Sequence, residues 1–276
     1  MAEVLYNCDE GDCMIFREEA KIKSSAKLAT GVYEIWFETE NIARNAIPGQ
    51  FISVYSNSKE KLLPRPISIC RIDGNLLRIV YRVVGGGTYE FSNMKAEDIL
   101  TIQGPLGNGY ELDKIKDRIE ENGSFKKALL FGGGIGIPPM LQLAASLDID
   151  TEVVLGYRDS ENFLLDEFKE VAKVHIATDD GLVGFKGNVV DAAKSENLEA
   201  DVIFACGPMP MLKGVKAYAN SLGVPAYISL EEKMACGIGA CLGCVCKTTK
   251  LDEHSKVNNA RVCKEGPVFD AMEVEI

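Results

Sequence analysis

Three cysteines near the carboxyl end of the sequence have a spacing that suits iron–sulfur chemistry. Cys236, Cys241 and Cys244 form a Cys-x4-Cys-x2-Cys pattern, and Cys263 follows later in the chain. Plant-type 2Fe–2S clusters are bound by four cysteines with this kind of spacing. Glycines between the cysteines let the backbone pass close to a cluster and point N–H groups at the sulfurs. The sequence therefore predicts a 2Fe–2S cluster on these four thiolates.

Two other interpretations of the cysteine segment stay open. Structural zinc usually takes two Cys-x2-Cys pairs or a mixture of Cys and His, so the x4 gap favours iron and sulfide. Buried free thiols are the second alternative. Cys246 is a fifth cysteine nearby, for which a buried apolar role is favoured over ligation. It is nevertheless the alternative to Cys263, which lies farthest along the chain from the other three.

A glycine-rich stretch, Gly132-Gly-Gly-Ile-Gly-Ile-Pro-Pro139, follows a strand-like run and opens a helix. The N-terminus of a helix offers free N–H groups to a pyrophosphate, and glycines let the ligand approach. Pro139 stands where the Rossmann pattern has its third glycine, which indicates a different kind of dinucleotide domain. A tight packing corner would also explain the glycines. Cys206-Gly-Pro-Met209 follows another strand at the same predicted sheet edge, where a structural turn is equally consistent.

Two further motifs lie in the β-rich first part of the chain. Arg65-Pro66-Ile67-Ser68 begins a strand, and its guanidinium could bind a phosphate while the serine and the backbone meet a planar ring. From these residues alone, an exposed arginine before an ordinary strand is the favoured interpretation. Gly85-Gly-Gly-Thr88, before a short helix expected over 89–94, could form a second phosphate-binding turn. Two such sites in one region favour a bound cofactor.

Residues 1–108 are expected to form a small antiparallel β-barrel. Apolar and polar residues alternate in several short runs separated by turn residues, and Asp73-Gly-Asn75 predicts a hairpin. The runs are Gly31–Thr39, Gln50–Tyr55, Pro66–Ile72 and Leu76–Val84.

Residues 109–230 change to alternating strands and helices, which predicts a parallel sheet covered by helices on both faces. The expected strands are 127–131, 152–157, 174–178 and 201–205, and the expected helices are 139–147, 163–172 and one that ends at Leu222. Residues 231–276 are too few to fold around their own core, so a cluster is expected to stabilise them. Gly266–Asp270 is expected to pack back onto the rest of the protein. The fold class is therefore α+β with several domains.

Composition narrows the class of protein. A net charge of −11 disfavours a nucleic-acid partner, which would need clustered Lys and Arg. No run approaches the ~20 apolar residues that span a bilayer and no signal peptide is visible, so a cytoplasmic protein without a membrane partner is expected. No role is assigned to Cys8, Cys13 or Cys70. His175 and His254 lack a catalytic arrangement, and no catalytic side chain is predicted.

Taken in order, these motifs resemble those of the electron-transfer subunits of NAD-dependent (class 1B) dihydroorotate dehydrogenases. The motifs are Arg-Pro-Ile-Ser, Gly-Gly-Thr, Gly-Gly-Gly-Ile-Gly-Ile-Pro-Pro, Cys-Gly-Pro and Glu-Glu-Lys-Met-Ala-Cys-Gly-Ile-Gly-Ala-Cys, and the resemblance covers residues 20–272. The broader group is the ferredoxin-NADP reductase superfamily, in which a flavin-binding barrel precedes a pyridine-nucleotide domain. Many of its members have an aromatic residue where Ile67 stands, so this side chain is not expected to stack on a flavin, and the narrower family accepts Ile.

The resemblance implies that the chain binds FAD, NAD and a 2Fe–2S cluster. The residues implied for FAD are Arg65, Pro66, Ile67, Ser68, Val80, Tyr81, Arg82, Gly87 and Thr88. Those implied for NAD, within the turns Gly132–Pro138 and Cys206–Met209, are Gly133, Gly134, Gly136, Pro138, Cys206, Gly207, Pro208 and Met209. The implied cluster ligands are Cys236, Cys241, Cys244 and Cys263.

The resemblance also implies an activity. Electrons taken from dihydroorotate by FMN on a partner catalytic subunit would pass through the cluster and FAD to NAD+ in pyrimidine biosynthesis, within a heterotetramer of two subunits of each type. A cluster on a chain without a substrate site predicts a docking surface around Ile238–Leu242. One alternative is a related flavin and iron–sulfur subunit that exchanges electrons between NAD(P)H and ferredoxin or polysulfide. Another is a zinc-containing, nucleotide-binding regulatory module without turnover.

Overall fold

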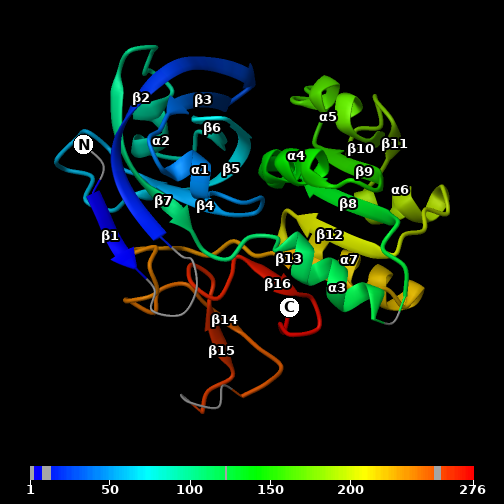
Figure 1. Cartoon of the computed structure of the whole chain (residues 1–276). Coiled ribbons are helices and arrows are strands. Elements are labelled where there is room, and N and C mark those ends of the chain that lie inside the picture. Colours follow the sequence, from blue (N-terminus) through cyan, green and yellow to red (C-terminus); the bar gives the residue numbers. More distant parts are fainter. Residues whose placement is uncertain (1–2, 8–13, 122, 252–255) are drawn as a thin grey trace.

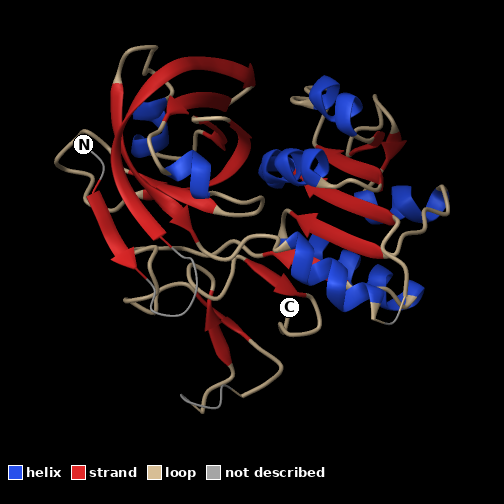
Figure 2. Cartoon of the chain, viewed as in Figure 1, coloured by secondary structure: helices blue, strands red, loops and turns tan. Residues whose placement is uncertain are grey.

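The computed structural model describes residues 3–7, 14–121, 123–251 and 256–276. Within these ranges the chain forms two seven-stranded sheets and a small hairpin (Figures 1 and 2). The expected α+β fold is confirmed, because an antiparallel barrel, a parallel-sheet unit and a cysteine-containing segment follow one another. The domain boundaries after residues 108 and 230 stay predictions. Cys8, Cys13 and His254 lie outside the described residues.

The first sheet is antiparallel and closes on itself. Its strands follow the order β1-β2-β3-β6-β5-β4-β7, and an additional pairing of β2 with β7 joins six of them into a barrel. Ile35 and Phe37 alternate with more polar neighbours and fill the interior. The strands are β1 (Glu3–Asn7), β2 (Met14–Ala29), β3 (Val32–Glu38), β4 (Phe51–Val54), β5 (Arg65–Asp73), β6 (Leu76–Arg82) and β7 (Ile99–Leu106), and the helices are α1 (Ile42–Asn45) and α2 (Gly86–Phe91).

The long strand β2 is the main element of the barrel that sequence periodicity does not predict. Most of its residues are charged or small, and Phe16, Ala20 and Ile22 are the apolar residues that it places in the barrel interior. It forms a strand because its two edges pair with β3 and β7, which satisfies its backbone hydrogen bonds. Tertiary pairing therefore outweighs the weak local preference of this sequence.

The second sheet is parallel except at one edge, with the strand order β11-β10-β9-β8-β12-β13-β16. Helices α3, α4 and α5 pack on one face and α6 and α7 on the other, which confirms the predicted arrangement. The strands are β8 (Lys127–Gly133), β9 (Asp150–Tyr157), β10 (Lys173–Thr178), β11 (Phe185–Lys186), β12 (Val202–Cys206), β13 (Ala226–Ser229) and β16 (Val268–Asp270). The helices are α3 (Leu112–Glu120), the 3-10 turn η1 (Gly134–Gly136), α4 (Ile137–Ser146), α5 (Leu165–Val171), α6 (Val189–Ser195) and α7 (Met209–Leu222).

The strand order of the second sheet reverses between β8 and β12. In open α/β sheets the loops on either side of such a reversal leave in opposite directions and open a crevice at the carboxyl ends of the strands. Gly132 of β8 lies beside Cys206 of β12 in the parallel register. The glycine-rich turn and the Cys206–Met209 turn therefore lie next to each other at the place where this fold binds ligands.

The carboxyl-terminal segment is joined to the second sheet at both of its ends. It leaves the sheet after β13, carries the cysteine loop, and forms the hairpin of β14 (Val245–Lys247) and β15 (Asn259–Arg261) (Figure 1). It then returns as β16, which pairs antiparallel with β13. The prediction that Gly266–Asp270 packs back onto the protein is confirmed.

Polar contacts join the barrel to the parallel-sheet unit. The Ile72 N–H of β5 donates to Gln142 Oε1 of α4 at 2.8 Å. The Glu161 carboxylate accepts the Thr30 N–H at 3.0 Å and the Thr30 hydroxyl at 2.9 Å. Arg78 of β6 binds a carboxylate on α5. Among the helices described, none has the length and the apolar character that a bilayer crossing requires.

Candidate functional site

The cysteine loop brings Cys263 together with the loop that carries the other three cysteines. The Gly239 N–H donates to the Cys263 sulfur at 3.1 Å, and the Cys263 N–H lies 3.4 Å from the Cys244 sulfur. Cys244 and Cys263 are buried, Cys236 is half-buried and Cys241 is exposed. Backbone N–H groups therefore point at these sulfurs, which is the arrangement that iron–sulfur clusters use.

Two glycines give the loop its shape. Gly237 has φ +70° and Gly239 has φ +82°, in the left-handed region that favours glycine. A Cβ on Gly239 would lie 2.9 Å from the side chain of Lys264, and one on Gly237 would lie 3.0 Å from Ser53 Oγ of β4. The loop is consequently pressed against the barrel at β4.

The electrostatic environment of the thiols fits metal ligation. Burial raises the pKa of Cys236, but the N–H groups of Ile238, Cys241 and Ala240 outweigh it and bring that pKa down to about 7. Burial, with the adjacent Cys244 thiol, raises the pKa of Cys263 to about 12. Two thiols that face each other hold a proton tightly unless a cation lies between them, and metal binding removes that proton.

Four thiols carried by one loop and the hairpin beside it, three of them approached by backbone N–H groups, fit a 2Fe–2S cluster. In the described part of the chain, no three His, Cys, Asp or Glu side chains converge on a single ion. A two-iron cluster does not need such a point, because its four thiolates are divided between two irons. Cys246 lies on β14 and packs against the hydrophobic core, where burial raises the pKa of its thiol.

The motifs around Arg65 and Gly87 meet at the start of α2. A Cβ on Gly87 would lie 2.0 Å from Arg65 Nε, so the guanidinium lies directly on this helix. The Thr88 hydroxyl accepts the N–H groups of Val84 at 3.0 Å and Gly85 at 3.2 Å, which fixes the turn before the helix. A guanidinium beside free helix N–H groups is suited to phosphate.

The short helix expected over 89–94 begins earlier than predicted, and that prediction of its bounds is wrong. The helix observed is α2, Gly86–Phe91, and it starts on the glycines. Its start is set by Gly85 in extended conformation and by the Thr88 side chain, which binds back to the residues before the helix. Sequence propensity disfavours glycine in a helix, so the glycines hide a start that local capping determines.

The strand residues implied for FAD lie on β5 and β6, and their side chains divide between two faces. Ile67 and Tyr81 point into the barrel core, whereas Val80 packs against the parallel-sheet unit. Ser68 is half-buried, and Pro66 and Arg82 are exposed. The buried Tyr81 hydroxyl has no hydrogen-bond partner among the described residues.

The two turns implied for NAD pack tightly against each other. A Cβ on Gly136 would lie 2.3 Å from the Cys206 carbonyl oxygen, and one on Gly133 would lie 2.5 Å from Met211 Sδ. These glycines serve the packing corner that the sequence left open as an alternative. Gly134 differs, because it has φ +56° and open space around its Cβ position.

Residues around this corner complete the candidate NAD site. Pro138 is buried in the first turn of α4, and Gly207 packs on Met211. Pro208 and Met209 are exposed at the start of α7. Gly134 and the start of α4 are therefore the parts of the corner that a dinucleotide can approach.

The three candidate sites meet at one junction. The η1 turn lies against β6, which places the candidate NAD turn on a strand implied for FAD. Ser53, which Gly237 of the cysteine loop approaches, pairs with Pro66 across β4 and β5. One strand of the barrel therefore separates the cysteine loop from the strand that begins with Arg65.

Arg261 and Glu265 belong to the candidate cluster site, although no sequence motif indicates them. They flank Cys263, and the Arg261 guanidinium donates to the Gly239 carbonyl at 2.9 Å. The pKa of Arg261 is raised, first by its hydrogen bond to Glu265, and negative charge on Cys263 and Cys244 acts in the same direction. The signal in the sequence is an Arg and a Glu on either side of the candidate ligand Cys263.

Other polar clusters lie away from this junction. His175 binds Glu152 at 2.5 Å and Glu196 at 2.6 Å. Glu152 lies near the amino end of β9, at the sheet edge opposite the crevice. Lys127 lies 2.7 Å from Glu152, so the cluster is internally paired.

Cys70 is buried between the two units, where burial raises the pKa of its thiol to about 12.

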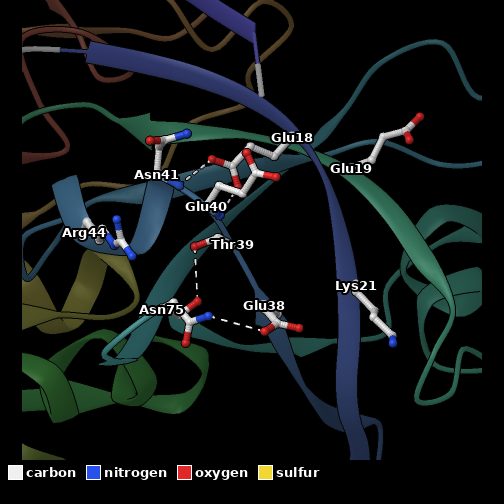
Figure 3. Close-up of a pocket in the computed structure, with 9 residues that line it drawn as sticks. All are labelled: Glu18, Glu19, Lys21, Glu38, Thr39, Glu40, Asn41, Arg44 and Asn75. Atoms are coloured by element: carbon white, nitrogen blue, oxygen red, sulfur yellow. Dashed lines mark hydrogen bonds between the residues drawn. The ribbon is translucent and has the colours of Figure 1, made fainter. Parts of the chain in front are cut away.

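A surface hollow of about 560 Å³ lies on the barrel beside Glu18 and Thr39 (Figure 3). Its buried carboxylate, Glu18, accepts the N–H groups of Glu40 at 2.8 Å and Asn41 at 2.7 Å. These contacts satisfy the carboxylate and fix the start of α1. The hollow contains none of the residues implied for a cofactor.

Sequence comparison gives matches over the whole chain and over its last segment. A family model described as the iron-sulfur cluster binding domain of dihydroorotate dehydrogenase B matches residues 231–275. A dihydroorotate dehydrogenase B (NAD(+)), electron transfer subunit, from Fusobacterium nucleatum subsp. nucleatum is 39% identical over 270 residues, covering 94% of this chain and 98% of the relative. The subunit of the same name from Listeria monocytogenes serovar 1/2a is 40% identical over 268 residues, covering 95% and 100%.

Solved structures share the fold. A structure of an NADH-dependent reduced ferredoxin-NADP oxidoreductase superposes with a TM-score of 0.78 at 29% identity, covering 94% of this chain and 90% of that one. A ferredoxin NADP+ reductase from Neisseria gonorrhoeae, solved with bound FAD and NADP, gives a TM-score of 0.61 at 14% identity, covering 75% of this chain and 92% of that one. The second likeness supports the fold alone.

Proposed function

Because this chain belongs to the family of electron transfer subunits of dihydroorotate dehydrogenase B (NAD(+)), we propose that it carries electrons between a dihydroorotate-oxidising catalytic subunit and NAD+. FAD and a 2Fe–2S cluster are the groups that it binds for this purpose. The reaction belongs to pyrimidine biosynthesis, and the protein acts in the cytoplasm.

The meeting of the three candidate sites at one junction is the observation that supports this function most strongly. The η1 turn touches β6, and Gly237 of the cysteine loop reaches Ser53 beside β5. Electron transfer between bound groups requires them to be close together.

Residues of the barrel and of the parallel-sheet unit divide the binding between them. Arg65 and the first N–H groups of α2 bind the FAD diphosphate, and Thr88 holds the turn in place. Gly134 and the start of α4 bind the NAD pyrophosphate. When bound, FAD exchanges two electrons with NAD as a hydride and single electrons with the cluster.

The cysteine segment supplies the contact with the catalytic subunit. Ala240, Cys241 and Leu242 are exposed at the tip of the loop, and the Leu242 side chain is 63% exposed. An exposed leucine beside a thiolate ligand suits a partner that must approach the cluster closely. The partner is the FMN-containing catalytic subunit, and the assembly is a heterotetramer with two subunits of each type.

Co-purification with the catalytic subunit, followed by an assay of dihydroorotate-dependent NAD+ reduction, tests the proposal directly. We expect flavin and iron–sulfur absorbance in the purified complex and NADH formation on addition of dihydroorotate. A colourless protein that contains zinc would contradict the proposal. Reduction of NAD+ from ferredoxin but not from dihydroorotate would support the alternative reductase.

A Cys244→Ser variant separates the two halves of electron transfer. The hydroxyl is a poor ligand for iron, so we expect loss of the cluster and of transfer to the partner. The FAD site lies on β5, β6 and α2, so we expect reduction of FAD by NADH to continue at a rate within about twofold of the wild type, measured by stopped-flow absorbance. Loss of FAD reduction with intact partner transfer would contradict the proposed order of transfer.

A further inference from the structure

An ion pair joins the residues two positions before and two positions after the fourth candidate ligand, Cys263. Arg261 ends β15, Glu265 lies two residues after Cys263, and their side chains form an ion pair. Arg261 Nε lies 3.1 Å and 3.0 Å from the two carboxylate oxygens of Glu265, and the Arg261 N–H donates to Glu265 Oε2 at 2.7 Å. Such a pair with several hydrogen bonds has a defined geometry, unlike an isolated surface ion pair.

The guanidinium side of this pair faces the cysteine loop. Arg261 Nη1 donates to the Gly239 carbonyl at 2.9 Å, and the Gly239 N–H donates to the Cys263 sulfur at 3.1 Å. A Cβ on Gly239 would lie 3.4 Å from Arg261 Nη1. Arg261 therefore holds the residue whose N–H reaches the sulfur, and its positive charge lies next to the loop.

The two charges act on the cluster in opposite directions. One-electron reduction of a 2Fe–2S cluster adds one negative charge, so a nearby cation and hydrogen bonds to sulfur raise the reduction potential, and a nearby anion lowers it. Arg261 supplies the cation and positions the hydrogen bond. Glu265 offsets the cation and keeps its side chain in place.

We propose that the Arg261–Glu265 ion pair sets the reduction potential of the cluster, with Arg261 as the positioning residue for the Gly239 N–H. This inference rests on the proposed function, because it requires the cluster to be bound. The step affected is the one-electron reduction of the oxidised cluster. In the test, dithionite supplies this electron through redox mediators.

Potentiometric titration followed by EPR, on the purified holoenzyme, tests the inference. For Glu265→Gln we expect a higher potential than in the wild type, because the guanidinium loses its counter-charge. For Arg261→Gln we expect a lower potential, because the carboxylate is left uncompensated and the Gly239 N–H is released. For each variant we expect a tenfold change in the equilibrium constant for reduction of the cluster. For one electron, this corresponds to a shift of about 59 mV in the reduction potential.

Three further variants control the experiment. Arg261→Lys keeps the charge and should restore part of the potential, and the double variant with both Gln substitutions should lie between the two single variants. Lys250→Gln removes an exposed positive charge in the same segment and should shift the potential by much less. Iron content per chain is measured for each variant, so that cluster loss is recognised.

The results distinguish the inference from the proposed function. Shifts of the same sign for Arg261→Gln and Glu265→Gln, or shifts no larger than that of Lys250→Gln, would overturn the inference. If Arg261→Gln loses its cluster, Glu265→Gln alone tests the inference: a higher potential than in the wild type supports it, and an unchanged or lower potential overturns it. Absence of an EPR signal from the reduced wild-type protein would instead overturn the proposed function itself.

Discussion

Cys263 and Cys246 differ in what surrounds their sulfur atoms. The Cys263 sulfur accepts the Gly239 N–H, and its own N–H approaches the Cys244 sulfur. Cys246 lies opposite Ala260 in the β14–β15 hairpin and packs against the core. The sequence predicted Cys263 as the fourth ligand and kept Cys246 as the alternative. Spacing could not choose between them, because the hairpin geometry determines which of these thiols returns to the loop.

Serine substitution separates these two cysteines. We expect Cys263→Ser to lose the cluster, with iron and sulfide per chain falling by more than half, because it removes a ligand thiolate. Cys246→Ser should keep wild-type iron content and lower the free energy of unfolding by about 1 kcal/mol, because a half-buried apolar contact becomes polar. Iron and sulfide analysis with EPR checks both, and the reverse pattern would make Cys246 the fourth ligand.

The turn between β8 and α4 shows how far an element can be predicted from its sequence. The glycine run and the following prolines predicted a strand, a tight turn and a helix, and all three are present. The sequence could not predict which glycines serve packing and which leave space for a ligand. Gly136 is needed because the Cys206 carbonyl, far along the chain, lies against it. Helix α3 was not predicted, although Ile115 and Ile119 stand at helical spacing, and β2 was missed because it forms through its pairing partners.

Alanine substitution at two glycines with the same backbone conformation tests the NAD site. Gly134 has φ +56° and Gly31 has φ +71°, and both have open space at the Cβ position. Each Gly→Ala change should cost roughly 1 kcal/mol of stability, because the left-handed region disfavours a Cβ. Only Gly134→Ala should weaken NADH binding. We expect the affinity for NADH to fall at least fivefold, as measured by fluorescence titration. Equal affinity in both variants would exclude Gly134 from the nucleotide site.

At the scale of the whole molecule, the angle between the barrel and the parallel-sheet unit decides whether the two candidate cofactor sites face each other. Arg78 of β6 is 4% exposed and donates to Glu34 of β3 at 2.6 Å and to Glu167 of α5 at 2.6 Å and 3.0 Å. Burial lowers the pKa of Arg78, but the bond to Glu167 and the charge of Glu34 outweigh it and raise the pKa. Sequence motifs predicted both units, but not this contact, because the three residues are far apart in the chain and share no pattern.

Removing Arg78 should therefore affect both stability and electron transfer. Arg78→Met leaves the half-buried Glu34 without its partner and removes a buried guanidinium from the contact between the units, and we expect a loss of about 3 kcal/mol in the free energy of unfolding by urea. Glu167→Gln keeps the Arg78–Glu34 pair and involves a half-exposed carboxylate, so its cost should stay within about 1 kcal/mol.

Both variants release the contact between the units, so both should slow the reduction of FAD by NADH in stopped-flow measurements. Lys21→Met, which breaks the exposed pair with Glu97, should change neither quantity. A normal rate of FAD reduction in Glu167→Gln would show that the remaining contacts, from Gln142 and Glu161, are enough to set the angle.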